Sequence, residues 1–297
     1  MKGDHPIDPQ GPTGQLRLLE PLAATLRRFI PERADDDGLF GPRSLVWRVH
    51  RDRSFLLAGV RSLLMQALHP LAMAGVAQHS NWRRDPFGRI AATSAYMLTV
   101  TYGSRAAANA AAARVRAVHT HINGIDDVTG LAYRAGDPAL LLWVHVAMVE
   151  SIVTIVQRYG RGLDDVDADR YVAETVPFAE VVGVQAGQVP TTVAGLREFI
   201  TSVPLLQATP AAKEAMAVVL DPPELDAELR DLWRDLGQVA VGTLPQWARS
   251  LYGYATPAPE TLEREPVRQL LGVLDFAFES QPGVIEARRR IELRMRA

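Results

Sequence analysis

The amino-acid sequence predicts one all-α domain, a single multi-helix bundle over residues 41–297, preceded by an N-terminal extension over residues 1–40. From Ser44 onward, apolar residues recur with the 3.6-residue period of amphipathic helices, and alternating β-branched runs are few. Helix-capping residues punctuate this pattern at several points. The chain has 297 residues without an internal repeat or a Gly/Ser-rich linker, which favours one domain over two.

The expected elements follow one another with short breaks. The extension carries proline, glycine and acidic clusters, and it contains one short helical pattern over residues 16–31. Within the domain we expect helices over residues 54–80, 88–103, 104–123, 138–159, 168–188, 193–202, 210–219, 222–238, 240–252 and 261–295. Any sheet is expected to be no larger than a short hairpin.

Local signals support three of these helices. Pro70 interrupts the first, because proline cannot donate to the helical hydrogen-bond ladder. Ser104 is an N-cap residue for the third. The fourth has start and stop signals at both ends, with Asp137 as N-cap, Pro138 at the first helical position and Gly160 after the last turn. This fourth helix is apolar on almost every side, so we expect it at the centre of the bundle.

Two histidines at the end of the 104–123 pattern are candidates for a buried site. On a helix, His119 shares an apolar stripe with Val115, whereas His121 lies about 200° around the axis from His119. We therefore predict that His119 faces the core and His121 faces solvent. His145, on the most apolar helix, is a second buried candidate. A buried neutral imidazole needs a partner for its N–H, so each ring is held either by a structural hydrogen bond or by a bound group.

Composition excludes several classes of site and partner. The chain has no cysteine, which excludes disulfides, iron–sulfur clusters, zinc–thiolate sites and haem attached through cysteine. The net charge of −2, from 32 basic and 34 acidic residues, gives no electrostatic case for nucleic acid. The N-terminus shows no apolar signal core and no segment reads as a membrane span, so we expect a cytoplasmic protein, for which peripheral membrane contact remains open.

Common catalytic motifs are absent from the chain. No Glu-x-x-His pair indicates a ferritin-like di-iron site, and no His-Glu-x-x-His, Gly-x-Ser-x-Gly or Walker A stretch occurs. The pattern that remains is a small-molecule or cofactor pocket inside a helical bundle, with one buried histidine as the axial group.

Five segments together resemble a known family. They are LLMQALHPLAMAGVAQHS, DPFGRIAATSAYMLTVTYG, VRAVHTHINGI, YRAGDPALLLWVHVAMVES and LPQWARSLYG. Taken in this order, they are similar to the large bacterial and fungal family that contains the catalytic domain of rubber oxygenase and the mycophenolic-acid-pathway oxygenase. The similarity runs from about Pro42 to Tyr252.

The resemblance implies an all-α, partly globin-like fold around a non-covalent haem b. Its proximal iron ligand lies in an Arg-x-x-His stretch, which corresponds here to Arg116 and His119, with Arg116 one turn earlier to orient a haem propionate or a group next to the ligand. An Arg and a Thr four residues apart on the distal side correspond to Arg89 and Thr93. Rubber-cleaving members carry a lysine just before this threonine, and the present chain has Ala92 instead, so a lysine cap on the iron is not expected.

The function implied by this resemblance is that of a haem b-dependent oxygenase, which acts with O₂ on an apolar, lipid- or isoprenoid-like substrate. His119 would hold the iron, with His145 as the second candidate for this role, and Arg89 and Thr93 would hydrogen-bond oxygen on the distal side. The alternatives are a non-enzymatic helical protein that binds haem or a lipid, and a structural protein without a cofactor.

Overall fold

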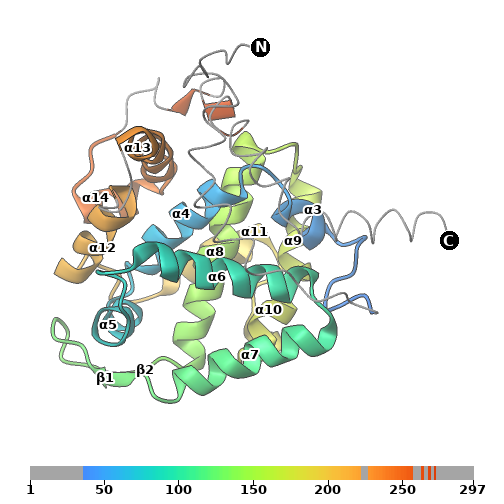
Figure 1. Cartoon of the computed structure of the whole chain (residues 1–297), viewed down its shortest axis with the longest axis horizontal. Coiled ribbons are helices and arrows are strands. Elements are labelled where there is room, and N and C mark those ends of the chain that lie inside the picture. Colours follow the sequence, from blue (N-terminus) through green and yellow to red (C-terminus); the bar gives the residue numbers. More distant parts are fainter. Residues whose placement is uncertain (1–35, 222–226, 257–261, 264–266, 269–270, 272–297) are drawn as a thin grey trace, which may run out of the picture.

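The structure, a computed structural model, describes residues 36–221, 227–256, 262–263, 267–268 and 271. Within these ranges the chain is mostly helical, and the sheet is one hairpin, β1 (Asn123–Ile125) paired antiparallel with β2 (Ala132–Arg134) (Figure 1). The helices are α3 (Leu45–His50), α4 (Phe55–Gln66), α5 (Pro70–His79), α6 (Pro86–Tyr102), α7 (Arg105–His119), α8 (Pro138–Tyr159), α9 (Asp165–Glu174), α10 (Val176–Glu180), the 3-10 turn η1 (Ala186–Gln188), α11 (Val193–Ser202), α12 (Pro210–Leu220), α13 (Ala227–Gly242) and α14 (Gln246–Tyr252). The predicted all-α class is confirmed. The helices predicted over residues 16–31 and 261–295 lie outside the described residues, the latter except for five positions.

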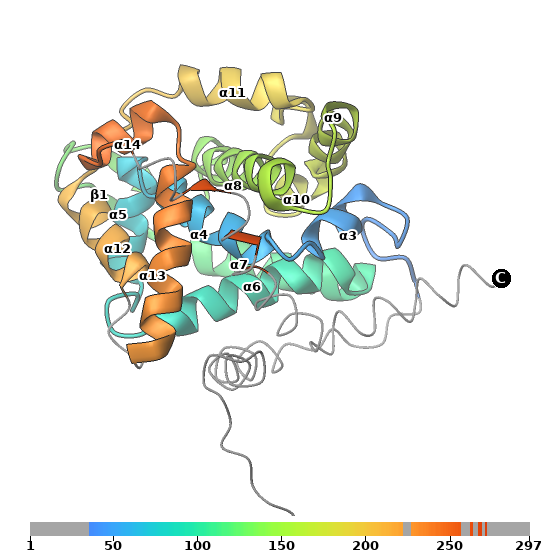
Figure 2. The same ribbon diagram turned by 90° about the horizontal axis from the view of Figure 1, so that it is seen from above.

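Helix α8 passes through the centre of the molecule, and the other helices surround it (Figures 1 and 2). It begins as predicted: the Asp137 carboxylate accepts a hydrogen bond from the N–H of Ala139 at 2.8 Å, and Pro138 occupies the first turn. Helix α4 packs along α8, and α11, α10 and α5 also contact it. Its apolar residues are buried on nearly all sides, which confirms the predicted central position.

A buried ion pair connects α4 to α8 inside this core. Arg61 of α4 is 1% exposed, and its guanidinium donates to the two carboxylate oxygens of Glu150 on α8 at 2.6 and 3.2 Å. The same group donates to the Ser151 hydroxyl at 2.6 Å and to the carbonyl of Thr243, just after α13, at 3.2 Å. Because buried charges are tolerated only when paired and hydrogen-bonded, this network determines how α4, α8 and the end of α13 fit together.

A neutral histidine lies in a second buried polar cluster. The Nδ1 of His50, at the end of α3, is 2.9 Å from the Thr101 hydroxyl on α6, and its Nε2 is 2.9 Å from the Tyr171 hydroxyl on α9. Burial lowers the pKa of His50 to about 3, so the ring carries no charge. The cluster therefore joins three helices through neutral hydrogen bonds.

The predicted 54–80 helix is two helices whose axes differ by 103°. The chain turns at His69, which has extended backbone angles because the proline that follows it disfavours the helical conformation. The sequence prediction of an interruption at Pro70 is thus confirmed, and the structure adds that the chain changes direction there. This turn directs α5 away from α4 and opens space between them and α8.

The end of the predicted 104–123 helix is wrong by four residues. Helix α7 ends at His119, and Thr120 and His121 form a turn that leads into β1. The chain leaves the helix early because Asn123 pairs with Arg134 in the hairpin. This strand pairing cannot be predicted from the helical pattern of residues 104–123.

Two further predicted helices are broken at prolines. Residues 168–188 form the end of α9, the short helix α10 and the η1 turn, with Pro177 in the first turn of α10. Residues 240–252 contain the end of α13 and all of α14, separated at Pro245. Proline lacks an N–H and collides with the carbonyl four residues earlier, so neither stretch can form one continuous helix.

Among the described residues, α8 is long and apolar enough to span a membrane, and the bent α4–α5 pair meets the same criterion if counted as one segment. In the structure, 78% of the apolar window of α8 is buried inside the protein, as is typical of the core helix of a globular fold.

Candidate functional site

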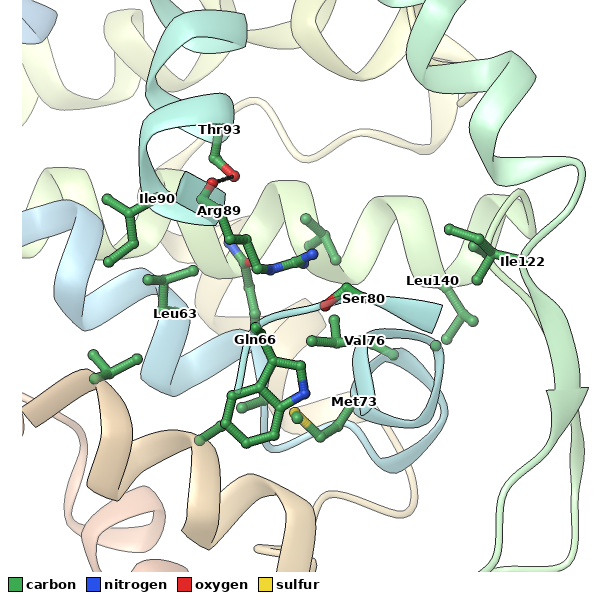
Figure 3. Close-up of a pocket in the computed structure, with 18 of the residues that line it drawn as sticks. Leu63, Gln66, Met73, Val76, Ser80, Arg89, Ile90, Thr93, Ile122 and Leu140 are labelled. Atoms are coloured by element: carbon green, nitrogen blue, oxygen red, sulfur yellow. Dashed lines mark hydrogen bonds between the residues drawn. The ribbon is translucent and has the colours of Figure 1, made fainter. Parts of the chain in front are cut away.

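A cavity of about 350 Å³ lies between α4, α5, α6, α7, α8 and α12. The 103° turn between α4 and α5 positions two of its walls, and α12 covers the side next to α5. Figure 3 shows side chains from these walls converging on one space, including Leu63 of α4, Met73 and Val76 of α5, and Leu140 of α8. The size is within the range of small-molecule and cofactor sites.

The walls of the cavity are mainly apolar. Its polar side chains are Gln66, Ser80, Arg89, Thr93 and His119, together with the indole N–H of Trp82. No aspartate, glutamate or lysine is among the described residues that line it. The cavity therefore suits an apolar body with few polar groups.

His119 lies at the cavity, where the last turn of α7 meets the space between α6 and α8. Its ring is half-buried and lines the cavity, whereas His121 is exposed and does not. The predicted orientations of the two rings are confirmed, although His121 lies in the turn after α7 and not on the helix. Burial lowers the pKa of His119, and the positive charge of Arg89 lowers it further. The ring is neutral near pH 7 and has no hydrogen-bond partner among the described residues.

Arg89 and Thr93 come from α6 and line the same cavity as His119. Helix α6 begins where the Asp85 carboxylate accepts the N–H of Gly88 at 2.7 Å, which places Arg89 in the first turn and Thr93 one turn later. Figure 3 shows the Arg89 side chain extending into the cavity toward Ser80. The Thr93 hydroxyl donates to the Arg89 carbonyl at 3.1 Å, so its proton is already engaged with the backbone.

Arg89 and Thr93 are exposed residues although they line the cavity, so the cavity is open to solvent. Val118 and Val144, which also line the cavity, are 57% and 37% exposed and mark the opening. The surrounding walls nevertheless lower the pKa of the Arg89 guanidinium through desolvation. Solvent reaches the side chain, but the apolar walls remove part of its hydration.

The structure does not bring Arg116 or His145 to this cavity. Arg116 is exposed on α7, and its guanidinium donates to the carbonyl of Val181 after α10. His145 is buried within α8 and is not among the lining residues. Its Nε2 has no hydrogen-bond partner, and burial lowers its pKa to about 4. Three of the five candidate residues therefore share one site.

Sequence reasoning missed Trp82 and Ser80, which follow α5 and form part of the cavity wall. The Trp82 ring is covered by the Arg83 guanidinium at 4.5 Å, and Arg83 forms a two-pronged ion pair with Glu214 of α12 at 2.7 and 2.8 Å. These contacts hold the corner between α5 and α6 against α12. Residues 81–84, NWRR, belong to no recognised motif, so no local signal indicates that Trp82 lies at the cavity.

A comparison with protein families matches residues 47–276 to the family described as "ER-bound oxygenase mpaB/B'/Rubber oxygenase, catalytic domain". No curated protein matches the chain. No solved structure matches it either. The matched segment covers more than half of the chain and includes every helix that lines the cavity. The chain therefore belongs to the mpaB/rubber oxygenase catalytic-domain family.

Proposed function

We propose that this protein is a haem b-dependent oxygenase that acts on an apolar, lipid- or isoprenoid-like substrate, with His119 as the proximal iron ligand. The observation that supports this proposal most strongly is the position of His119. Its neutral ring lines an apolar cavity and has no protein hydrogen-bond partner among the described residues. A neutral imidazole is the form that binds iron.

The lining residues fit a single-histidine haem site. No group of three or more His, Cys, Asp or Glu residues that could hold a bare metal ion occurs among the described residues. A porphyrin brings four nitrogens of its own, so one imidazole is enough to complete attachment. The apolar walls from α5, α8 and α12 suit the faces and edges of a macrocycle.

Haem, when bound, supplies an iron that can take up and activate O₂. The chain's own residues then have three tasks. His119 would hold the cofactor through one ring nitrogen, and burial and the charge of Arg89, which lower the pKa of the ring, favour the unprotonated form. Arg89 provides N–H donors inside the cavity. The apolar walls would hold the hydrocarbon part of the substrate.

The test of this function is a haemin titration of the purified apo-protein, followed by absorbance. Wild type and the matched control His121→Ala, which changes an exposed ring two residues away, should each take up one haem. His119→Ala should bind haemin at least about tenfold more weakly, because its one strong bond to the iron is lost. Added imidazole should restore the spectrum of His119→Gly, since a free ligand can enter the space left by the side chain.

An unchanged Soret peak and affinity in His119→Ala would refute the assignment, and His145→Ala would then be the next variant. O₂ consumption with a long-chain alkene separates an oxygenase from a haem-binding protein without turnover. A protein that fails to bind haemin but takes up the alkene would favour the lipid-binding alternative.

A further inference from the structure

The cavity contains one charged side chain and no counter-charge. Arg89 is the one formally charged residue among the described residues that line it, and the other polar lining groups are neutral. The other titratable group of the cavity is His119, whose pKa is lowered by burial and further by the charge of Arg89. The electrostatic character of this space is therefore positive, although its walls are mostly apolar.

Arg89 differs in its lack of an acidic partner from three arginines that connect or support helices. Arg61 pairs with Glu150, Arg83 with Glu214 and Arg170 with Glu174. For the Arg89 guanidinium, by contrast, no ion pair or hydrogen bond exists among the described residues, and the one bond at this residue involves its backbone carbonyl. Arg89 is exposed to solvent although it lines the cavity, so its unpaired guanidinium is accessible to an anionic ligand that enters.

The geometry around Arg89 is suited to a carboxylate. Its side chain extends into the cavity toward Ser80 (Figure 3), and the planar guanidinium offers parallel N–H donors that match the two oxygens of a carboxylate. A separate wall of the cavity is formed by α12 through Ala215, Met216, Val218 and Val219, which carry no side-chain nitrogen or oxygen. A ligand that spans both regions has an anionic head and an apolar body.

We propose that Arg89 is the anchor for the carboxylate of an amphiphilic ligand whose apolar body lies against α12. As a statement on substrate class, this rests on the proposed function, whereas carboxylate binding itself is a property of the apo-protein. A neutral hydrocarbon that filled the cavity would remove more water from Arg89 without providing a partner. A long-chain acid provides the partner and fills the apolar walls with its chain.

Two sources can supply this chemistry, because a haem propionate is also a carboxylate on an apolar body. Calorimetric titration of the apo-protein distinguishes them with two pairs of probes. The first pair is palmitate and hexadecan-1-ol, which share a chain and differ in the charge of the head. The second pair is haemin and its dimethyl ester, which share a macrocycle and differ in the free propionates.

The expected result is a preference for the acid of at least about tenfold in one or both pairs, since charge-assisted pairs are the stronger hydrogen bonds. Arg89→Gln should remove this preference by weakening the acid while leaving the alcohol or the ester unchanged. Arg84→Gln is the matched control, because Arg84 is exposed in the turn before α6 and does not line the cavity. Circular dichroism of both variants confirms that the fold is retained.

The pattern across the pairs identifies the source of the carboxylate. Preference for palmitate indicates a substrate head group, and preference for haemin alone indicates a propionate. Equal affinity within both pairs for wild type, or an acid preference that survives in Arg89→Gln, overturns the proposal. The failure of the proposed function would appear separately, as a protein that binds palmitate through Arg89 and takes up no haemin.

Discussion

Acid should destabilise this fold through two histidines that are buried in the neutral form. Burial lowers the pKa of His50 to about 3 and that of His145 to about 4, whereas both rings titrate near the ordinary value of 6.5 in the unfolded chain. Below pH 6.5 the unfolded state therefore binds more protons than the folded state. Stability is complete above this pH and falls as the pH drops from 6.5 toward 4.

The magnitude follows from these values. At pH 5, each histidine favours the unfolded chain by about 2 kcal/mol relative to pH 7, so both together remove about 4 kcal/mol. This is a large fraction of the roughly 5–15 kcal/mol by which most domains are stable. Urea unfolding at pH 7 and pH 5, followed by far-UV circular dichroism, measures the change in the free energy of unfolding.

Variants assign the change to particular rings. His50→Gln and His145→Gln, which cannot take up a proton, should each reduce the difference in unfolding free energy between pH 7 and pH 5 by about 2 kcal/mol, whatever their stability at pH 7. His121→Gln is the control and should keep the full dependence, because its ring is exposed in the folded protein as in the unfolded chain. If the two buried-histidine variants kept the slope of wild type, the proton linkage would lie elsewhere and this reasoning would be wrong.

Two further predictions concern the packing of the fold. Glu150→Ala should lower the free energy of unfolding, measured in urea, by about 3–5 kcal/mol because it leaves Arg61 buried without its partner. A double variant with Arg61→Met and Glu150→Leu should regain most of this stability. A double variant as unstable as Glu150→Ala would contradict the prediction. Gly38→Ala should lower the melting temperature more than Gly253→Ala. Both glycines have left-handed angles, φ +69° and +76°, but a Cβ at Gly38 would lie 2.4 Å from the carbonyl oxygen of Gly103, whereas Gly253 has open space; equal shifts would refute the clash.

Helix positions were predictable where capping and composition agree. The Asp137, Pro138 and Gly160 signals match the ends of α8, because these residues act on the helix termini within one turn. The end of α7 was not predictable in this way. It depends on the hairpin that pairs Asn123 with Arg134. The partner strand lies outside residues 104–123, so the helical pattern of these residues carries no information about it.

The candidate site was predictable in part. The spacing of residues in the sequence places Arg89 and Thr93 on one face of a helix and His119 on an apolar stripe. The structure brings these two faces to one cavity. Spacing could not show that Arg116 reaches the Val181 carbonyl, 65 residues away, because that contact depends on how α7 and α10 pack. The contribution of Trp82 also depends on tertiary packing, through the Arg83–Glu214 pair.

The carboxylate of Glu150 has a consequence before folding is complete. Helix α8 alone is apolar and long enough to enter a lipid bilayer, so a newly made chain exposes a segment that membrane-insertion machinery could accept. A charge near the centre of such a segment opposes insertion by roughly 2.5–3.5 kcal/mol. In the folded protein Arg61 neutralises this same charge. Replacing both residues by apolar ones would therefore leave the folded core stable and make the nascent chain easier to divert into a membrane.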